Sequence, residues 1–409
     1  MPLQPNWKLR WSILMVLALP TLLLFGWSIL HPAKSVKGKA YAAQSQAIRV
    51  KPAITPPPSP SGSWIMQDSG TTASLRGIHS VDGKIGWASG TEGTVLRTTD
   101  GGEHWTRCTT PPDATKLDFR GIQAFDSNMA FVLSSGPGDQ SRLYKTTDAC
   151  KTWQLSFQND DKQGFWDAIQ MWTPADGFLA GDPVAGHPFL AEFTPSSGIA
   201  STQNILTKVA AKSGSDGAYA ASNSSIALGP FREGEGAPRE VWFAVGGTAG
   251  SRVIHYQHFQ GGQPERVATS ISDAPMFPSS ASGGIFSIAL HTETGPFRNV
   301  IATRSTLIAV GGDYTKSNEA SGTAAWSSDG GKTWHAATTP PHGYRSSVAW
   351  SDTLDAWVTV GTNGSDISTD DGKTWQRLQD PVMADGNWNA LSPPFVVGPK
   401  GRIARLTGK

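Results

Sequence analysis

Short apolar runs of four to six residues recur along the chain, separated by polar turns that contain Gly, Asp or Asn. The clearest unit covers residues 76–107, where the pattern predicts strands at 76–81, 85–90, 93–98 and 104–107. Runs of this length between tight turns are typical of antiparallel strands. Four such strands in roughly 45 residues make one blade of a β-propeller. The pattern therefore predicts an all-β fold.

The same unit returns along the rest of the chain. Innermost strands are predicted at 75–78, 119–122, 165–169, 218–221, 285–288, 344–348 and 388–391. Second strands are predicted at 130–133, 177–182, 241–247, 307–313, 356–361 and 394–398, and insertions at 186–202, 229–239 and 313–322. We therefore expect a seven-bladed propeller of four-stranded antiparallel blades. Eight blades would also fit, because 181 residues separate Asp148 from Asp329.

The last repeat has three predicted strands and ends with residues 401–406. A strand at residues 63–68 precedes the first innermost strand and has no blade of its own. We expect it to complete the last blade, because a closed ring leaves no open sheet edge.

One turn is repeated four times with the form Ser/Thr-x-Asp-x-Gly-x-Thr-Trp. It is complete at 327–334 and 368–375 and altered at 98–105 and 146–153, and its marker residues are Asp100, Asp148, Asp329 and Asp370 with Trp105, Trp153, Trp334 and Trp375. An Asp in a tight turn accepts backbone N–H groups, and Gly allows a left-handed conformation. The pattern predicts a structural hairpin turn. His104 replaces Thr in one copy, and Cys150 replaces Gly in another, so we expect that turn to be strained or shaped differently.

These four turns resemble the Asp-box, or BNR, repeat. That repeat occurs in sialidases, sortilin-type receptors, some glycosidases and the photosystem II stability/assembly factor family. The resemblance implies that each turn lies between the outer two strands of a propeller blade.

Composition narrows the functional classes. The chain has 45 Gly, 28 Pro and 16 Trp with only 16% charged residues, which is typical of many short strands. The formal net charge of +1 gives no reason to expect a nucleic-acid partner. Cys108 and Cys150 are 42 residues apart, close to one repeat, and could form a disulfide between blades or remain two buried thiols. No spacing between Cys and His residues in the sequence matches that of a zinc site.

The front of the chain predicts export. Residues 11–30 carry no charge and are long enough to span a bilayer as a helix. Lys8 and Arg10 precede this segment, which places the N-terminus in the cytoplasm and exports the rest. We expect a signal anchor or signal peptide at 1–32, a Pro/Ala/Lys-rich linker at 33–63 and the propeller at 64–409. The protein would then be anchored facing the periplasm or cell exterior, or secreted if the segment is cleaved.

The sequence contains no motif that identifies a catalysed reaction. The Arg-Ile-Pro motif of sialidases is absent, and the chain has six Tyr. No nucleophile elbow, phosphate loop or dinucleotide motif is present, so we predict no catalytic residues, cofactor or metal. An exported carbohydrate-active hydrolase of sialidase-like architecture is the alternative.

Polar residues are nevertheless predicted to gather at one channel mouth. Alignment of the innermost strands puts Arg76, Arg120, Asp167, Tyr219, Phe286, Ser346 and Asn389 in one ring. The candidate binding face comprises Arg76, Arg120, Asp167, Asp182, Asp313, Tyr314 and Arg345. These carboxylates could simply neutralise the Arg side chains within the channel, or the same residues could form a docking surface.

Four further strings, at residues 284–289, 310–314, 343–346 and 181–183, look like the photosystem II stability/assembly factor-like family. The resemblance covers about residues 64–409. It implies a seven-bladed propeller outside the cytoplasm. In photosynthetic members a propeller of this type is a non-enzymatic assembly factor that binds a membrane-protein subunit. We therefore predict an exported, protein- or peptide-binding module.

Overall fold

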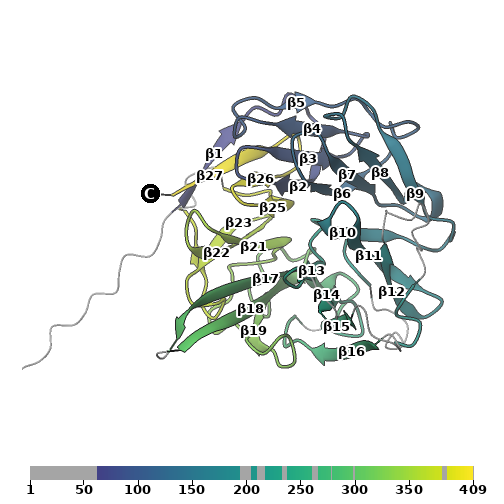
Figure 1. Cartoon of the computed structure of the whole chain (residues 1–409). Helices are drawn as coiled ribbons and strands as arrows, with labels where there is room; N and C mark the ends of the chain where they lie inside the picture. The colour runs from purple at the N-terminus through teal and green to yellow at the C-terminus, as the bar shows by residue number, and fades with distance from the viewer. Residues whose placement is uncertain are drawn as a thin grey trace, which may run out of the picture. The chain divides into compact units, whose positions relative to one another are not determined.

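The computed structural model describes residues 62–193, 204–209, 217–232, 237–259, 266–277, 279–297, 300–379 and 385–408. These residues form seven antiparallel sheets (Figure 1). The innermost strand of each sheet contacts the innermost strands of both neighbours, and these contacts return to the first sheet. Seven blades therefore surround a central channel. This confirms the predicted propeller and its number of blades.

The first four blades follow the chain from the second strand onward. Their strands are β2 (Leu75–Ser80), β3 (Gly86–Gly90), β4 (Val95–Thr98) and β5 (Thr106–Arg107) in blade 1; β6 (Phe119–Ala124), β7 (Ala130–Ser134), β8 (Arg142–Thr146) and β9 (Gln154–Gln158) in blade 2; β10 (Trp166–Thr173), β11 (Asp176–Val184) and β12 (His187–Phe193) in blade 3; and β13 (Ile226–Leu228), β14 (Pro238–Val245), β15 (Arg252–Phe259) and β16 (Arg266–Asp273) in blade 4. A short 3-10 helix, η1 (Gly138–Gln140), precedes β8. Blade 3 shows three strands within the described residues.

The last three blades complete the ring. Their strands are β17 (Gly283–Phe297), β18 (Val300–Asp313), β19 (Ala324–Ser327) and β20 (His335–Ala336) in blade 5; β21 (Ser347–Ser351), β22 (Ala356–Gly361), β23 (Gly364–Ser368) and β24 (Gln376–Arg377) in blade 6; and β25 (Ala390–Ser392), β26 (Phe395–Val397), β27 (Ile403–Gly408) and β1 (Gly62–Gln67) in blade 7. The hairpin β17–β18 is longer than predicted, and β19 pairs with only residues 307–310 of β18.

One predicted strand is misplaced. The innermost strand of blade 4 is β13, at Ile226–Leu228, and not residues 218–221. The earlier segment is held by other contacts: Gly217 forms an isolated bridge with Gly246, and Asp182 accepts the Ala218 N–H. Side-chain and single-bridge contacts therefore replace a strand ladder there.

The first strand closes the ring as predicted. β1 pairs with β27 from Gly62 opposite Gly408 to Gln67 opposite Ile403, so the strands at the two ends of the propeller lie side by side (Figure 1). Trp64 is buried, lies 5.9 Å from Trp388 between ring centroids, and donates its indole N–H to the Ser365 hydroxyl at 2.9 Å. The strand is therefore held by side chains as well as by its ladder.

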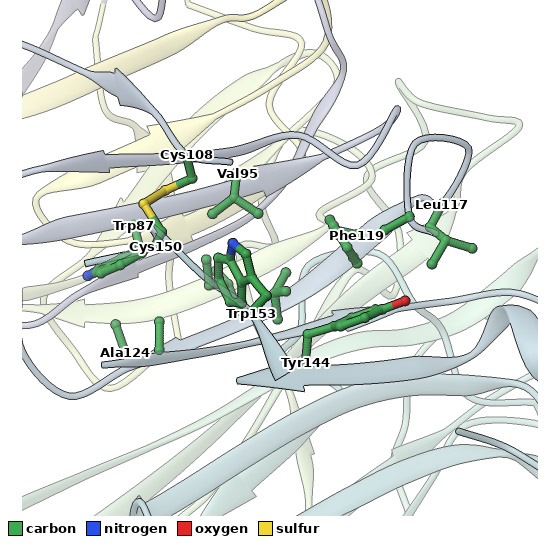
Figure 2. Close-up of a cluster of buried hydrophobic side chains, with 13 residues drawn as sticks. Trp87, Val95, Cys108, Leu117, Phe119, Ala124, Tyr144, Cys150 and Trp153 are labelled. Atoms are coloured by element: carbon green, nitrogen blue, oxygen red, sulfur yellow. A yellow bond between two sulfur atoms is a disulfide. The ribbon is translucent and has the colours of Figure 1, made fainter. Parts of the chain in front are cut away.

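The core is divided into one apolar cluster between each pair of adjacent blades. The cluster between blades 1 and 2 illustrates the arrangement: Trp87 and Val95 of blade 1 meet Phe119 and Trp153 of blade 2 (Figure 2). Burial of such side chains contributes about 1.5–3 kcal/mol each. Because each cluster is shared, every blade depends on its two neighbours for stability.

The four repeated turns, which we call the box turns, have the predicted hydrogen bonds. In blade 5, Asp329 accepts the Thr333 N–H at 3.0 Å and the Thr333 hydroxyl at 2.6 Å. The equivalent Asp residues of blades 1, 2 and 6 accept the same pair of donors, with the His104 ring nitrogen in place of the Thr hydroxyl in blade 1. Each box Trp packs against the preceding blade. The box turns are therefore structural.

Cys150 occupies the Gly position of its box turn without changing the shape of that turn. Its φ of 59° lies in the left-handed region, as do the φ values of 88°, 82° and 76° at Gly102, Gly331 and Gly372. Its N–H donates to Thr146 at 3.1 Å, as the Gly N–H groups do in the other copies. The expected strain is present, because non-Gly residues rarely adopt this conformation. The expectation that this turn has a different shape is wrong.

Cys150 also forms a disulfide with Cys108, which resolves the two possibilities left by the sequence. Cys108 follows β5 in blade 1, so the bond joins blades 1 and 2 (Figure 2). In the other box turns the corresponding Gly faces the neighbouring blade closely; a Cβ on Gly331 would lie 3.0 Å from the Trp242 indole nitrogen. At Cys150 the same close approach allows the side chain to form a covalent bond with Cys108 of the neighbouring blade.

The apolar segment at residues 11–30 lies outside the described residues. Within the described part of the chain, no helix has the length and apolar character needed to cross a bilayer. The predicted anchor remains a prediction.

Candidate functional site

β-bulges place the key side chains at one mouth of the channel. The innermost strands of blades 1, 2, 3 and 5 each carry one extra residue near their start, and these residues are Arg76, Arg120, Asp167 and Phe286. A bulge turns its extra residue away from the regular alternation of the strand. The bulge recurs at the same position in these four blades. These four side chains therefore belong to one ring of positions, as the sequence alignment predicted.

Two arginines share one carboxylate in this ring. Asp118 accepts the Arg120 Nε–H at 2.9 Å, and its other oxygen lies 3.6 Å from Arg76 Nε. Arg76 and Arg120 keep 32% and 30% of their side chains exposed. Burial is the main cause that lowers the pKa of Arg76, the neighbouring Arg120 adds to it, and Asp118 opposes it. Arg76 Nε makes no hydrogen bond within the described structure.

This arrangement corrects the predicted pairing, because Asp118 and not Asp167, Asp182 or Asp313 is the ion-pair partner of both arginines. Asp118 was missed. Its signal was its position two residues before Arg120, close enough along the chain for the two side chains to meet.

A second group at the mouth is acidic and poorly compensated. Asp167 is 1% exposed, and its Oδ2 accepts no hydrogen bond among the described residues. Burial raises the pKa of Asp167 well above its usual value, Asp182 raises it further, and Arg120 opposes both. Burial also raises the pKa of Asp182, one oxygen of which accepts the Ala218 N–H at 3.1 Å. Removing carboxylates from water disfavours their charged form.

An aromatic group continues the mouth over blades 4 and 5. The Tyr219 ring stacks on Phe286 with centroids 3.9 Å apart. Phe286 also meets Tyr344 and Tyr314 edge-on, at 4.8 and 6.2 Å. Tyr314 is 54% exposed, whereas Phe286 and Tyr344 are buried. The mouth therefore offers charged groups on blades 1 to 3 and an accessible aromatic surface on blades 4 and 5.

Arg345 does not belong to an accessible face. Its side chain is fully buried, its Nε donates to Asp366 at 2.8 Å, and its Nη1 donates to Asn363 Oδ1 at 2.6 Å. His342 shares the same carboxylate, with its Nδ1 2.6 Å from Asp366 Oδ1. A buried charge needs such a partner. Asp366 faces inward from β23, a relation that sequence spacing did not reveal.

Asp313 is also withdrawn from the mouth surface. It is buried and accepts the Thr315 N–H at 2.9 Å and the Thr315 hydroxyl at 2.6 Å. Lys316 lies 3.8 Å from its other oxygen. Of the predicted binding face, Arg76, Arg120, Asp182 and Tyr314 remain at least partly exposed.

A separate pocket of about 360 Å³ lies between blades 4 and 5. It contains Glu240 and His255, whose carboxylate oxygen and ring nitrogen are 3.3 Å apart, and His255 stacks on Trp242. The close contact with His255, supported by the hydrogen bond from Gln257, outweighs burial and lowers the pKa of Glu240. A glycosidase acid needs a raised pKa, so this carboxylate is poorly suited to that role.

The fold and the mouth define the class of protein: a seven-bladed β-propeller with a polar and aromatic channel mouth. Comparison with solved structures finds the same fold in YCF48 bound to D1 peptide, at 18% sequence identity and a TM-score of 0.52, over 84% of this chain and 96% of that one. YCF48 from Cyanidioschyzon merolae matches at 17% identity and a TM-score of 0.50, over 84% of this chain and 99% of that one. No family model and no curated protein matches the chain.

Proposed function

We propose that this protein is a non-enzymatic propeller that binds an extended segment of a protein partner at the channel mouth. The observation that carries the proposal is the pair of partly exposed arginines, Arg76 and Arg120, with one carboxylate between them. Arg binds carboxylates through paired N–H donors, and the side chains of Arg76 and Arg120 are 32% and 30% exposed. An acidic side chain or a terminal carboxylate of a peptide fits these donors. Tyr314 adds an exposed aromatic contact.

The comparison with YCF48 adds a ligand class. The solved structure of that propeller contains a D1 peptide. The two proteins are alike in fold, and from this likeness we infer only that this chain also binds a peptide. Because a peptide ligand implies a protein partner, we further infer an assembly-factor-like role, as in the family that the sequence resembles.

We further infer that the protein is exported and tethered by its N-terminal apolar segment. The disulfide between Cys108 and Cys150 supports export, because such bonds persist mainly in oxidising compartments. We also interpret the four box turns as Asp-box repeats, because they combine the sequence pattern with a shared set of hydrogen bonds.

The geometry favours binding over the hydrolase alternative. A sialidase-like mechanism would need an activated Tyr nucleophile, but the hydroxyl of Tyr219 at the mouth donates to the Gly283 carbonyl at 2.8 Å. Burial is the main cause that raises its pKa to about 12, so the phenol is not activated. Asp167 is buried beneath the surface and could not reach a sugar without rearrangement.

Binding can be measured with the full-length protein in detergent against an array of short fluorescein-labelled peptides that vary in Glu, Lys and Tyr content. We expect Glu-containing peptides to bind and the double variant Arg76→Ala, Arg120→Ala to lose at least tenfold in affinity, since charge-assisted hydrogen bonds contribute about 1.5–3 kcal/mol each. Arg107→Ala, an exposed residue of outer strand β5, is the matched control. Unchanged binding in the double variant would refute the site. Turnover of aryl glycosides, including a sialoside, that disappears in Asp167→Asn would instead support a hydrolase.

A further inference from the structure

The acidic and aromatic groups of the channel mouth are contiguous. Asp182, in β11, accepts the backbone N–H of Ala218 at 3.1 Å, and the next residue along the chain is Tyr219. Tyr219 stacks on Phe286, and Phe286 meets the exposed Tyr314 edge-on. Asp182 and Tyr314 are both close enough to Tyr219 to raise the pKa of its hydroxyl. A partly buried carboxylate and two tyrosines therefore border the same part of the mouth.

No cation of the described chain neutralises this part of the mouth. Asp167 and Asp182 repel each other, and Arg120 is the only cation that acts on Asp167. The Nε of Arg120 donates to Asp118 and its Nη1 donates to the Ala220 carbonyl at 3.2 Å, so these two nitrogens have partners other than Asp167. The Asp167 Oδ2 atom is buried and accepts no hydrogen bond.

Lys316, two residues after Tyr314 in the chain, is also occupied. Lys316 lies 3.8 Å from Asp313 and 5.5 Å from the centre of the Phe277 ring. It is thus held by another carboxylate and another aromatic ring. The local charge pattern is therefore two carboxylates beside the half-buried Tyr219 and the exposed Tyr314, and Arg120 is the one described cation that acts on Asp167.

We propose that this part of the mouth, formed by Asp182, Tyr219 and Tyr314, binds a lysine or arginine side chain of the same peptide whose acidic group contacts Arg76 and Arg120. This inference rests on the proposed function and specifies its ligand: a segment that carries one acidic and one basic residue. Aromatic faces attract an ammonium or guanidinium ion through the ring quadrupole. A carboxylate at the edge adds a charge-assisted hydrogen bond.

The chemistry selects an organic cation over a metal ion. A hard metal ion would need several oxygen ligands around one point. Here one oxygen of Asp182 is taken by the Ala218 N–H, Asp167 is buried, and the exposed partners are aromatic. Asp182 and the two tyrosines together suit a long basic side chain, with its stem on the rings and its head at the carboxylate.

The test uses the full-length protein in detergent and three synthetic peptides on a Gly/Ser/Tyr host. The first carries one Glu and one Lys, the second replaces Lys by norleucine, and the third replaces Glu by Gln. Asp182→Asn should weaken binding of the Glu/Lys peptide by about tenfold and leave the norleucine peptide unchanged, because only the Lys side chain can make the charge-assisted hydrogen bond to Asp182. Equal affinities of Asp182→Asn and wild type for the Glu/Lys peptide would overturn the subsite.

Two further variants separate the possible failures. Tyr314→Leu keeps an apolar side chain at an exposed position, so it tests the aromatic face without disturbing the core; we expect about a threefold loss for the Glu/Lys peptide alone. Asp355→Asn is the control for loss of a surface carboxylate. If Arg76→Ala, Arg120→Ala weakens both Glu peptides while Asp182→Asn and Tyr314→Leu change neither, the subsite is wrong and the proposed function stands. If the arginine variant changes neither peptide, the proposed function fails.

Discussion

The disulfide between blades 1 and 2 allows a sharp test of how the box turn of blade 2 is stabilised. Cys150 has a left-handed backbone at a position where the other three box turns have Gly. Two opposing effects therefore meet at one residue. The cross-link to Cys108 stabilises the fold, whereas the side chain of Cys150 imposes a conformational cost. Replacing both cysteines separates these effects if Cys150 is changed to Ala in one variant and to Gly in another.

The magnitudes follow from chain statistics and sterics. A cross-link between residues 42 positions apart removes loop entropy from the unfolded chain that corresponds to about 4 kcal/mol. A non-Gly residue in the left-handed region costs about 1 kcal/mol relative to Gly. The variant Cys108→Ala, Cys150→Ala should therefore lose about 4 kcal/mol of unfolding free energy. The variant Cys108→Ala, Cys150→Gly should lose only about 3 kcal/mol.

Urea denaturation, followed by Trp fluorescence with and without reductant, measures these differences. We expect the order wild type, Gly variant, Ala variant without reductant, and we expect reductant to lower only the wild-type midpoint. A Gly variant that is less stable than the Ala variant would refute the claim that Cys150 carries backbone strain. A wild-type midpoint that reductant does not change would refute the stabilising role of the bond.

Three further predictions concern other parts of the propeller. Trp64→Ala should destabilise the fold by about 3–5 kcal/mol because it empties a buried site that closes the ring, whereas Ile65→Ala, at a 56% exposed position of the same strand, should change the thermal midpoint little. Burial raises the pKa of Asp167. The contribution of its protonated carboxyl to the free energy of unfolding is therefore fully present below about pH 4 and is lost as the pH rises through the raised pKa. Asp167→Asn should then be more stable than wild type at pH 8 and similar near pH 4 in urea titrations, and a constant difference would contradict this reasoning. Hydrogen bonds from the Thr152 hydroxyl and N–H lower the pKa of Asp148 to about 2, so its contribution is present above about pH 4 and is lost as the pH falls through about 2. The advantage of wild type over Asp148→Asn in thermal midpoint should vanish over that range; an advantage that persists at pH 1.5 would count against the prediction.

The number and order of the blades could be predicted because local patterns determine them. Each box turn has its own Asp and Trp, and each bulge recurs at the same place in an innermost strand. The strand at residues 62–67 could be paired with β27 because it was the one strand without a blade. The innermost strand of blade 4 was misplaced because residues 217–218, which precede it, are held by Gly246 and Asp182 in other strands and loops and not by a strand ladder.

The candidate site was less predictable, because its charges are paired across space. The ring of Arg76, Arg120 and Asp167 followed from alignment, but the partner of the arginines did not. Arg345 had the same sequence context as a mouth residue, yet Asp366 on a later strand holds it inside blade 6. The cysteine spacing could not decide on a bond, because Cys108 and Cys150 lie on opposite sides of their box Trp residues. Their contact depends on the left-handed backbone of Cys150.

The pairing of β1 with β27 also sets the order of events during synthesis. Ser63 and Thr407, which share a hydrogen bond across this pair, are 344 positions apart in the chain. The first strand therefore emerges from the ribosome with no partner and stays unpaired until nearly all of the chain has been made. Blades 1 to 6 can assemble in sequence before that, because their strands are consecutive. Closure of the ring is then the slow, final step, since contacts between distant residues carry the largest loop-closure cost.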